Sequence, residues 1–597
     1  MELRDLKGYG QRSLTRLPRV SVGDTQRVLL LSILIGVFAG LLVVCFHIAI
    51  DVVSWWTVGI PAARHWSTVL WPAVGAATAA ALVRYVFRAA KGSGVVHTKA
   101  AVHVYDGRVD GSTVPGKFTV CAIAIGSGNS LGPEDPALQM GAGIASLIGR
   151  LFRLPREHMR RIAPVGAAAG IAAAFNTPIT AVLFVIEEVV GAWSANVLGS
   201  ILLAAVSAVV VSRSYLGDEP LFRVPDIQGF EPADLIVYAA IGVVGGVASV
   251  LYVRLMLWLK RRGDPHDRPL VQIGLPFIAG LFVGAVGLWL PQVMGPGYLS
   301  VDNALHGRFD ASTLLLLAAA KIIVTAMCFA AGTPGGLFAP TLFAGAMLGG
   351  GIDALAQVYW PHSESARVAS VLVGMGTFFA GVFRAPMTSI FMVFEVSASY
   401  QIILPAMIAN TIGYLIGRRW GRAHLFDELA RMEGMELPSL QEQREMPALT
   451  VEDAMSTAPI VLSADVSFED ARTALAGSNQ EYLVIRLAPL QFAALHRSSL
   501  EPASATRLVD AYGLTPAPRL YPDINLEFAL RTFGSRVALP IVRRNAPDEV
   551  AGLLTLDDVA RVFHLEGWPP KPPSEPPPDA LPGPEKAAEP ASGGTDR

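Results

Sequence analysis

The sequence has few charged residues and few cysteines for a chain of 597 residues. Charged residues make up 16%, against about 25% in soluble domains, whereas 52% of the residues are hydrophobic. The formal net charge of −2 lacks the basic excess of a nucleic-acid-binding protein, so no nucleic-acid partner is expected. The cysteines Cys45, Cys121 and Cys328 lie in apolar surroundings and indicate neither a disulfide framework nor a thiolate metal site. This composition favours a membrane protein.

The N-terminus also lacks the apolar core and the small-residue cleavage site of a signal peptide. Residues 1–27 instead contain six basic residues: Arg4, Lys7, Arg12, Arg16, Arg19 and Arg27. Basic residues that flank a membrane span usually stay on the cytoplasmic side. We therefore interpret residues 1–27 as a retained cytoplasmic segment. Both termini are expected in the cytoplasm, and the bacterial inner or plasma membrane is the expected location.

Several uncharged runs are long enough to cross a bilayer, which takes about 20 apolar residues. They occupy residues 28–50, 162–186, 189–212 and 396–417. A further run, 322–352, is interrupted by Gly332-Thr333-Pro334-Gly335-Gly336. Because backbone groups freed by a break find no water in lipid, the break must line a cavity or be buried in protein. The shorter run 117–132 ends in glycines and serines, and it predicts a helix that stops inside the membrane.

Two pairs of matching segments repeat along this apolar region. Gly-Pro-Glu-Asp-Pro at 132–136 matches Gly-Leu-Phe-Ala-Pro at 336–340 with an offset of 204 residues. Residues 175–187 match 383–395 with an offset of 208, and both segments end in glutamate. Two related halves with Gly/Pro-interrupted apolar segments indicate a transport site built from broken helices. We therefore predict an all-α polytopic membrane protein with two inverted-topology repeats and broken half-helices.

A half-helix that begins inside a membrane is a ready-made anion site. Its first N–H groups have no intrahelical partner, and its dipole places about half a positive charge at that end. Glycines let an ion approach the backbone, and a proline in the first turn removes only an unpaired N–H. The starts at 132–136 and 336–340 therefore predict anion binding without lysine or arginine. In a third candidate, Gly92-Ser93-Gly94, the Ser93 hydroxyl either donates to the ion or merely caps the next helix.

With these motifs in order, residues 28–435 resemble the CLC chloride channel and transporter family. Ser93 lies in the position of that family's first anion-binding motif, and serine there resembles the chloride-preferring members, so chloride is the expected substrate. In the third motif, the N–H groups of Leu337 and Phe338 are implied to hold the central anion. The resemblance thus implies an anion site made by Ser93, Gly94, Gly336, Leu337, Phe338 and Phe426.

Two glutamates have roles that the resemblance implies. Glu134 matches the gating glutamate, whose carboxylate competes with the anion for the same N–H groups and leaves when it is protonated. The simpler alternative is an acid that only benefits from the helix dipole, but an acid inside a membrane is a functional candidate by default. In the repeat, Glu187 pairs with Glu395, which predicts a structural role for both, whereas Glu188 pairs with Val396. This unmatched Glu188 matches the internal proton glutamate of the antiporters; its alternative is an acid at the water interface.

Three residues depart from the family pattern. Phe426 stands where a tyrosine is usual, so the central anion loses a hydroxyl donor. Asp135 replaces the glycine beside Glu134, and it either repels anions near the pore or points away into a polar pocket. Val95-Val96 replaces the usual Ile-Pro, with an expected effect on helix packing. Because of these departures, a passive chloride channel gated by voltage or pH remains the alternative to proton-coupled exchange.

Residues 449–566 have the composition of a soluble domain and contain two weak strand–helix repeats. They resemble a tandem pair of CBS domains, an α/β fold, on the cytoplasmic side. The resemblance implies an adenine-nucleotide site at Thr555 and Asp558, although Thr-x-x-Asp before an apolar run is also a helix-capping box, and the pattern favours that interpretation. The first repeat is degenerate around 487–499. Residues 567–597 are rich in proline and are predicted to be disordered.

The sequence therefore predicts four parts: a cytoplasmic segment at 1–27, a transmembrane domain at 28–435, the CBS pair at 449–566 and the tail at 567–597. We expect a homodimer in a lipid bilayer that exchanges chloride for protons, with Glu134 as gate and Glu188 as proton relay. No metal-ligand spacing and no nucleophile–base pair occurs at membrane depth, so neither a metal site nor an enzyme is predicted. No cofactor is expected apart from the adenine nucleotide. A sensor whose output is the CBS pair is the rival from another class.

Overall fold

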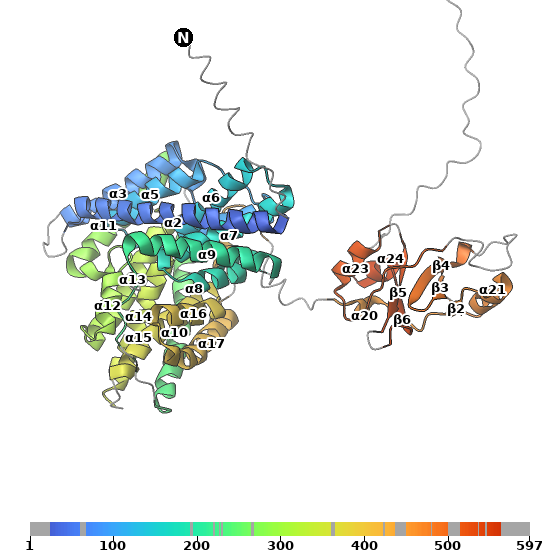
Figure 1. Ribbon diagram of the computed structural model, residues 1–597. Helices are drawn as coiled ribbons and strands as arrows, with labels where there is room; N and C mark the ends of the chain where they lie inside the picture. The colour runs from blue at the N-terminus through green and yellow to red at the C-terminus, as the bar shows by residue number, and fades with distance from the viewer. Residues whose placement is uncertain are drawn as a thin grey trace, which may run out of the picture. The chain divides into compact units, whose positions relative to one another are not determined.

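The computed structural model has two compact units, residues 1–444 and 445–597 (Figure 1). It describes residues 24–59, 67–191, 195–218, 221–225, 227, 231–263, 268–359, 364–421, 424–435, 437, 449–478, 480–499, 514–534, 536–543 and 546–562. The predicted Pro-rich tail and most of the N-terminal segment lie outside these residues.

The first unit is helical. Its first half contains α2 (Asp24–Thr57), α3 (Ser67–Tyr85), α4 (Gly94–His103), α5 (Thr113–Gly126), α6 (Glu134–Leu151), α7 (Arg156–Phe175), α8 (Pro178–Phe184), the π-helix η2 (Val185–Val190) and α9 (Ala195–Leu216). Its second half contains α10 (Asp234–Arg262), α11 (Pro269–Trp289), α12 (Tyr298–Leu305), α13 (Ala311–Ala330), α14 (Phe338–Ala356), α15 (Glu364–Phe383), α16 (Pro386–Ser397) and α17 (Ile403–Trp420), followed by α18 (Leu425–Met432).

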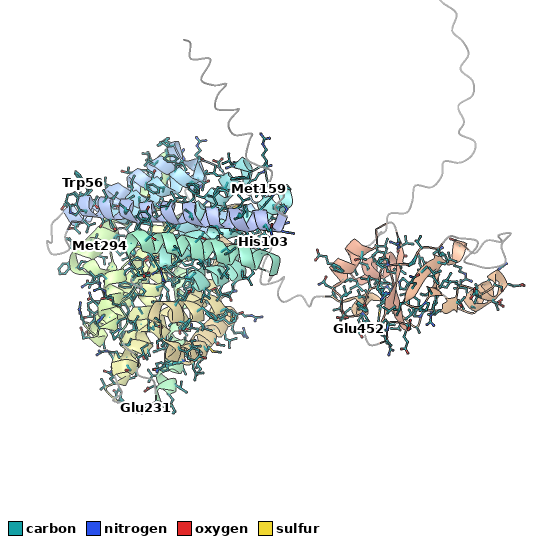
Figure 2. All side chains as sticks on the ribbon, viewed as in Figure 1. Trp56, His103, Met159, Glu231, Met294 and Glu452 are labelled. Carbon is teal, nitrogen blue, oxygen red and sulfur yellow. The ribbon has the colours of Figure 1, made fainter. Side chains whose placement is uncertain are left out.

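Length and composition suit this unit to a membrane. Within the described residues, eight helices are long and apolar enough to cross a bilayer. At the end of α2, Trp55 and Trp56 are exposed, and Figure 2 shows Trp56 at the periphery of the unit. Exposed tryptophans at a helix end are typical of the interface between lipid and water.

The packing of the two halves follows the same plan. In the first half α2 packs against α7 and α9, and in the second half α10 packs against α15 and α17; Figure 1 shows α2 beside α9. The counterparts α3 and α11 pack on each other, as do α8 and α16. Gly132 and Gly336 form an antiparallel bridge, in which each N–H donates to the other's carbonyl at 2.8 and 2.7 Å. Equivalent segments therefore run in opposite directions where the halves meet, as predicted for inverted repeats.

The breaks in the helices agree with the sequence in two places and differ in a third. α13 ends at Ala330 and α14 begins at Phe338, so the run 322–352 is interrupted as predicted, and α5 ends at Gly126. The run 162–186 is not one helix, contrary to our expectation. It breaks at Asn176, whose φ is 59°, because asparagine tolerates the left-handed region and Pro178 then starts α8 without needing an N–H partner.

The glutamates shared by the two halves are structural, as predicted. Glu187 accepts hydrogen bonds from the N–H and hydroxyl of Thr388, at 3.0 and 2.8 Å, at the start of α16. Glu395 does the same at the start of α8, where it accepts from the N–H groups of Ile179 and Thr180 at 2.9 and 2.6 Å. Each half thus supplies the carboxylate that caps a helix of the other half.

Replacing Glu395 with glutamine is expected to lower the free energy of unfolding by about 1.5–3 kcal/mol, because hydrogen bonds to a charged acceptor are lost at a helix start. Thermal unfolding of the detergent-solubilised protein, followed by tryptophan fluorescence, measures this change. The control is Glu231→Gln, since Glu231 is exposed at the periphery of the unit (Figure 2). Equal melting of both variants would contradict the capping role.

The second unit contains two small sheets. Its elements are α20 (Val451–Ala454), β1 (Ser456–Thr457), β2 (Val461–Ser463), α21 (Phe468–Ala476), β3 (Tyr482–Ala488), β4 (Gln491–His496), α23 (Leu526–Thr532), β5 (Ala538–Val542), β6 (Val550–Thr555) and α24 (Leu556–Val562). One sheet has the order β2-β3-β4 and the other β1-β6-β5. Their faces share a core that includes Val484 and Phe492 from one sheet and Val542 and Leu553 from the other. The segment 487–499, degenerate in sequence, contains the turn and β4 of the β3–β4 hairpin, whose register shifts between Arg486 and Ala488.

Candidate anion and proton site

The starts of three helices meet in the interior of the first unit. α6 and α14 are joined just before their first turns by the Gly132–Gly336 bridge. α4 packs against the same place: a Cβ atom at Gly94 would lie 2.2 Å from the carbonyl oxygen of Asp135. A Cβ at Gly336 would lie 2.8 Å from the Cβ of Asp135. Glycine is required at both positions because the three backbones approach too closely for a side chain.

Glu134 lies at the centre of this arrangement and is fully buried, with 0% of its surface exposed. Tyr298 donates its hydroxyl to Glu134 Oε1. The other oxygen lies beside the start of α14, because a Cβ atom at Gly132 would be 2.2 Å from Glu134 Oε2 and 3.1 Å from the backbone nitrogen of Ala339. The carboxylate therefore occupies the space in front of α14, where unpaired N–H groups attract an anion.

The contact of Glu134 with Tyr298 was not predicted from the sequence. Tyr298 is the first residue of α12, and Gly297 before it has a φ of 89°. The only local signal is this glycine-rich turn, Gly295-Pro296-Gly297, which begins a short helix inside the apolar region. Nothing in the spacing links it to a glutamate 164 residues away.

The sequence predicts that Glu134 competes with chloride, and on that prediction Tyr298→Phe is expected to tighten chloride binding by about tenfold or more. Losing a hydrogen bond to a charged group weakens the hold on this carboxylate by about 1.5–3 kcal/mol. Calorimetric titration of chloride into the purified protein measures the change. Tyr215→Phe is the matched control, because Tyr215 is exposed. Unchanged chloride affinity in Tyr298→Phe would show that Tyr298 does not hold the Glu134 carboxylate in place.

Asp135 points away from Glu134 and into the start of α4. Its Oδ1 accepts from Ser93 Oγ at 3.0 Å and from the Val95 N–H at 2.8 Å, and its Oδ2 accepts from the Gly94 N–H at 2.7 Å. The side chain is 3% exposed. The sequence left two alternatives, repulsion of anions near the pore or a side chain that points away into a polar pocket. The structure shows the second, and the polar pocket is the start of α4.

Phe426 lies in an aromatic stack that leads to α14. Its ring stacks on Phe383, with centroids 5.4 Å apart and an interplanar angle of 12°. Phe383 stacks in turn on Phe338, the first residue of α14, at 4.9 Å and 20°. The structure thus brings Phe426 and Phe338 to one cluster, in which Phe426 offers a ring face and no hydroxyl donor.

Glu188 is buried, with 3% of its surface exposed, so it does not emerge at the water interface. Its Oε1 lies 3.4 Å from Lys99 Nζ, and its Oε2 lies 3.2 Å from His424 Nε2. Lys99 also pairs with Asp427 at 2.8 Å. Glu188 belongs to the π-helix η2, a type of turn that often occurs at functional sites. It belongs to a compact polar network with Lys99, His424 and Asp427.

The partners of Glu188 come from distant parts of the chain and were not predicted. Lys99 lies on α4, whereas His424 and Asp427 flank the start of α18. The only signal in the sequence is a lysine within the segment 94–102, which is apolar apart from this lysine, His97 and Thr98. A buried lysine needs an acidic partner, but the sequence cannot show which acid supplies it.

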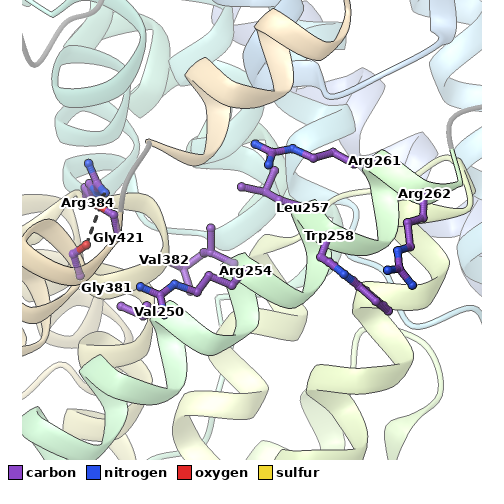
Figure 3. Close-up of a pocket in the computed structure, with 12 residues that line it drawn as sticks. Val250, Arg254, Leu257, Trp258, Arg261, Arg262, Gly381, Val382, Arg384 and Gly421 are labelled. Atoms are coloured by element: carbon purple, nitrogen blue, oxygen red, sulfur yellow. Dashed lines mark hydrogen bonds between the residues drawn. The ribbon is translucent and has the colours of Figure 1, made fainter.

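A cavity of about 470 Å³ opens between α10, α15 and α17 (Figure 3). Its lining includes Arg254, Arg261, Arg262 and Arg384. Arg384 Nη2 donates to the Gly421 carbonyl at 2.8 Å, the bond drawn in Figure 3. Arg254, Arg261 and Arg262 belong to the C-terminal part of α10, and Arg384 directly follows the end of α15. Cations near a helix C-terminus are favoured by the dipole.

Thr555 and Asp558 form a helix-capping box in the second unit. Asp558 Oδ2 accepts from the N–H and hydroxyl of Thr555 at 3.0 and 2.7 Å, and Thr555 Oγ1 accepts from the Asp558 N–H at 3.1 Å. Thr450 and Asp453 are bonded in the same manner, and hydrogen bonds from the N–H and hydroxyl of Thr450 lower the pKa of Asp453. This geometry is the capping interpretation of the sequence, and nucleotide binding stays a prediction.

Two inverted halves whose buried helix starts meet at one place define a membrane transport protein. The chain belongs to the voltage gated chloride channel family, whose model matches residues 74–418. A CBS domain model matches residues 510–565, the second of the two strand–helix repeats.

Relatives match over most of their own length. The putative chloride channel protein ClcB-like of Ralstonia nicotianae is 32% identical and aligns over 66% of this chain and 94% of its own. The H(+)/Cl(-) exchange transporter ClcA of Vibrio cholerae is 31% identical over 67% of this chain and 88% of its own. The crystal structure of a slow cyanobacterial Cl−/H+ antiporter superposes with a TM-score of 0.63 at 23% identity, over 70% of this chain and 99% of that chain. The fold is therefore that of a multi-pass CLC transporter.

Proposed function

We propose that this chain transports chloride across the membrane in exchange for protons. The observation that carries the proposal is the fully buried Glu134 carboxylate in front of α14. A carboxylate at this position competes with an anion while it is ionised and can carry a proton when it is neutral. The similarity to a relative described as an H(+)/Cl(-) exchange transporter supports the same reaction.

The central anion site lies at the start of α14. Its N–H groups at Leu337 and Phe338 bind chloride, and Gly336 leaves room for the ion to approach the backbone. Ser93 and Gly94 at the start of α4 supply the matching donors when Asp135, which accepts their hydrogen bonds in this structure, has left them. The ring of Phe426 closes the apolar side of the site through its stack with Phe383.

Glu134 acts as the gate. Its carboxylate blocks the start of α14 while Tyr298 holds it, and protonation removes the charge that the helix start attracts. The neutral side chain then leaves, and chloride takes its place. Binding of chloride and loss of the proton are thereby linked at one site.

Glu188 delivers protons from the cytoplasmic side. It is buried beside Lys99 and His424, and His424 Nε2 also lies 3.0 Å from the Phe383 carbonyl, next to the aromatic stack of the anion site. A buried acid in contact with a histidine is suited to proton transfer. The proposed proton route through Glu188 and His424 thus reaches the aromatic stack beside the anion site.

The protein is proposed to work as a homodimer in the bacterial inner or plasma membrane, each subunit with its own pathway. The basic C-terminal ends of α10 and α17 support a cytoplasmic location for that side of the membrane domain. Both termini then lie in the cytoplasm with the CBS pair. An adenine nucleotide near Thr555 and Asp558 would act as a regulator of transport.

A passive chloride channel is the second candidate. It is favoured by Phe426, which offers the central anion no hydroxyl, and by the similarity to a relative described as a putative chloride channel. A channel conducts chloride without moving protons, whereas an exchanger moves chloride only when protons move in the opposite direction. The two candidates share the same anion site and differ in the role of Glu188.

The test of chloride transport is uptake of radioactive chloride by liposomes that contain the purified protein and are loaded with unlabelled chloride. We expect uptake above that of protein-free liposomes, and we expect external chloride but not gluconate to compete. Absence of uptake would contradict both the exchanger and the channel.

A further inference from the structure

Asp135 occupies three donors at the start of α4. The hydroxyl of Ser93 and the N–H groups of Gly94 and Val95 all point to its two carboxylate oxygens, at 2.7 to 3.0 Å. Lys117 strengthens this position, because its buried ammonium group donates to the carbonyl of Gly92 at 2.6 Å, directly before Ser93. A helix start with a nearby cation is built to hold one anion, and Asp135 is that anion.

Adjacent carboxylates therefore fill two different anion positions. Glu134 lies in front of α14 and Asp135 in front of α4, although both side chains begin in the first turn of α6. Both carboxylates are buried. Tyr298 donates a hydrogen bond to Glu134, and Ser93 donates one to Asp135. The donors that Ser93 and Gly94 would offer to chloride are thus already saturated.

We propose that Asp135 is a second tethered carboxylate, which competes with chloride for the start of α4 and limits how tightly chloride is held in the central site. This inference rests on the proposed chloride transport. Ser93 can donate a hydrogen bond to chloride only when Asp135 has left the start of α4. Until then only the N–H groups of α14 bind chloride. The substitution of the usual glycine by Asp135 therefore sets the anion affinity of this chain.

The inference is tested by calorimetric titration of chloride into the purified full-length protein. Asp135→Gly and Asp135→Asn should both bind chloride at least about tenfold more tightly, because the competing charge is removed. Ser93→Ala should weaken binding at least about tenfold more in the Asp135→Gly background than in the unmodified protein. A cap without a role in anion binding would not create this dependence.

Asp310→Asn is the matched control. Asp310 caps α13 through Thr313 and lies away from the three helix starts, so its loss should leave chloride affinity unchanged. Thermal unfolding of each variant reports its folding separately. Asp135→Asn keeps the side-chain volume, so the test remains possible if the glycine variant folds poorly.

Chloride affinity unchanged in both Asp135 variants, together with earlier melting, would overturn the inference and leave Asp135 as a helix cap. An equal effect of Ser93→Ala in both backgrounds would also overturn it. These results leave chloride uptake by the unmodified protein intact. Absence of uptake and of chloride binding in the unmodified protein would instead overturn the proposed function, and the inference with it.

Discussion

Glu134→Ala is expected to abolish proton transport while chloride continues to cross the membrane. Proton flux should fall by at least about a hundredfold, the range in which positioned acid–base groups contribute. Alanine has no group that can carry a proton, and it leaves the donors in front of α14 open to chloride at all times. Flux of both ions in liposomes, measured over a range of pH, should show chloride flux that no longer depends on pH.

Glu134→Gln serves as the companion variant, because it keeps the size of the side chain and removes only its charge. It should behave like Glu134→Ala in proton flux. Proton transport against a gradient in either variant would contradict the role of Glu134 as gate and proton carrier. Slower chloride flux in the glutamine variant alone would reflect its bulk.

Glu188→Ala is expected to lose proton transport by at least about a hundredfold and to keep chloride transport. Glu188 is the buried acid that faces Lys99 and His424, so its removal interrupts the route for protons but not the anion site. Lys99 keeps its pair with Asp427 at 2.8 Å, so this buried cation still has an acidic partner. The variant should therefore fold.

Glu187→Gln is the matched control for Glu188, since the two glutamates are neighbours in η2. Glu187 caps α16 through Thr388 rather than facing Lys99. Its loss should lower thermal stability and leave the ratio of proton to chloride flux unchanged. Selective loss of proton flux in Glu187→Gln, or its retention in Glu188→Ala, would show that the roles of the neighbours are assigned wrongly.

The internal repeat made most of the fold predictable. The matching glycines and prolines placed two helix starts opposite each other, and Gly132 and Gly336 indeed bond to one another. Alignment of the halves also separated Glu187 from Glu188, and the structure gives the first a capping contact and the second a buried network. The break at Asn176 was not predicted, because residues 162–186 carry no charge and are long enough for one span; Pro178 was the local signal of a new helix start.

The site was less predictable, because its contacts join residues that no spacing links. Tyr298 reaches Glu134 across 164 residues, and Ser93 reaches Asp135 across 42. Asp135 could be recognised as unusual, but only the approach of α4 shows which N–H groups it takes. The partner of Lys99 could not be predicted either, because Asp427 lies 328 residues away in the sequence.

The measurement that most directly tests coupled exchange is the internal pH of liposomes that contain the purified protein, with the membrane potential clamped and only a chloride gradient imposed. Coupled exchange predicts that chloride drives protons in the opposite direction against their own gradient, and that proton movement stops when the chloride gradient is removed. Movement of chloride with no change of internal pH would contradict proton coupling and would make the protein a chloride channel.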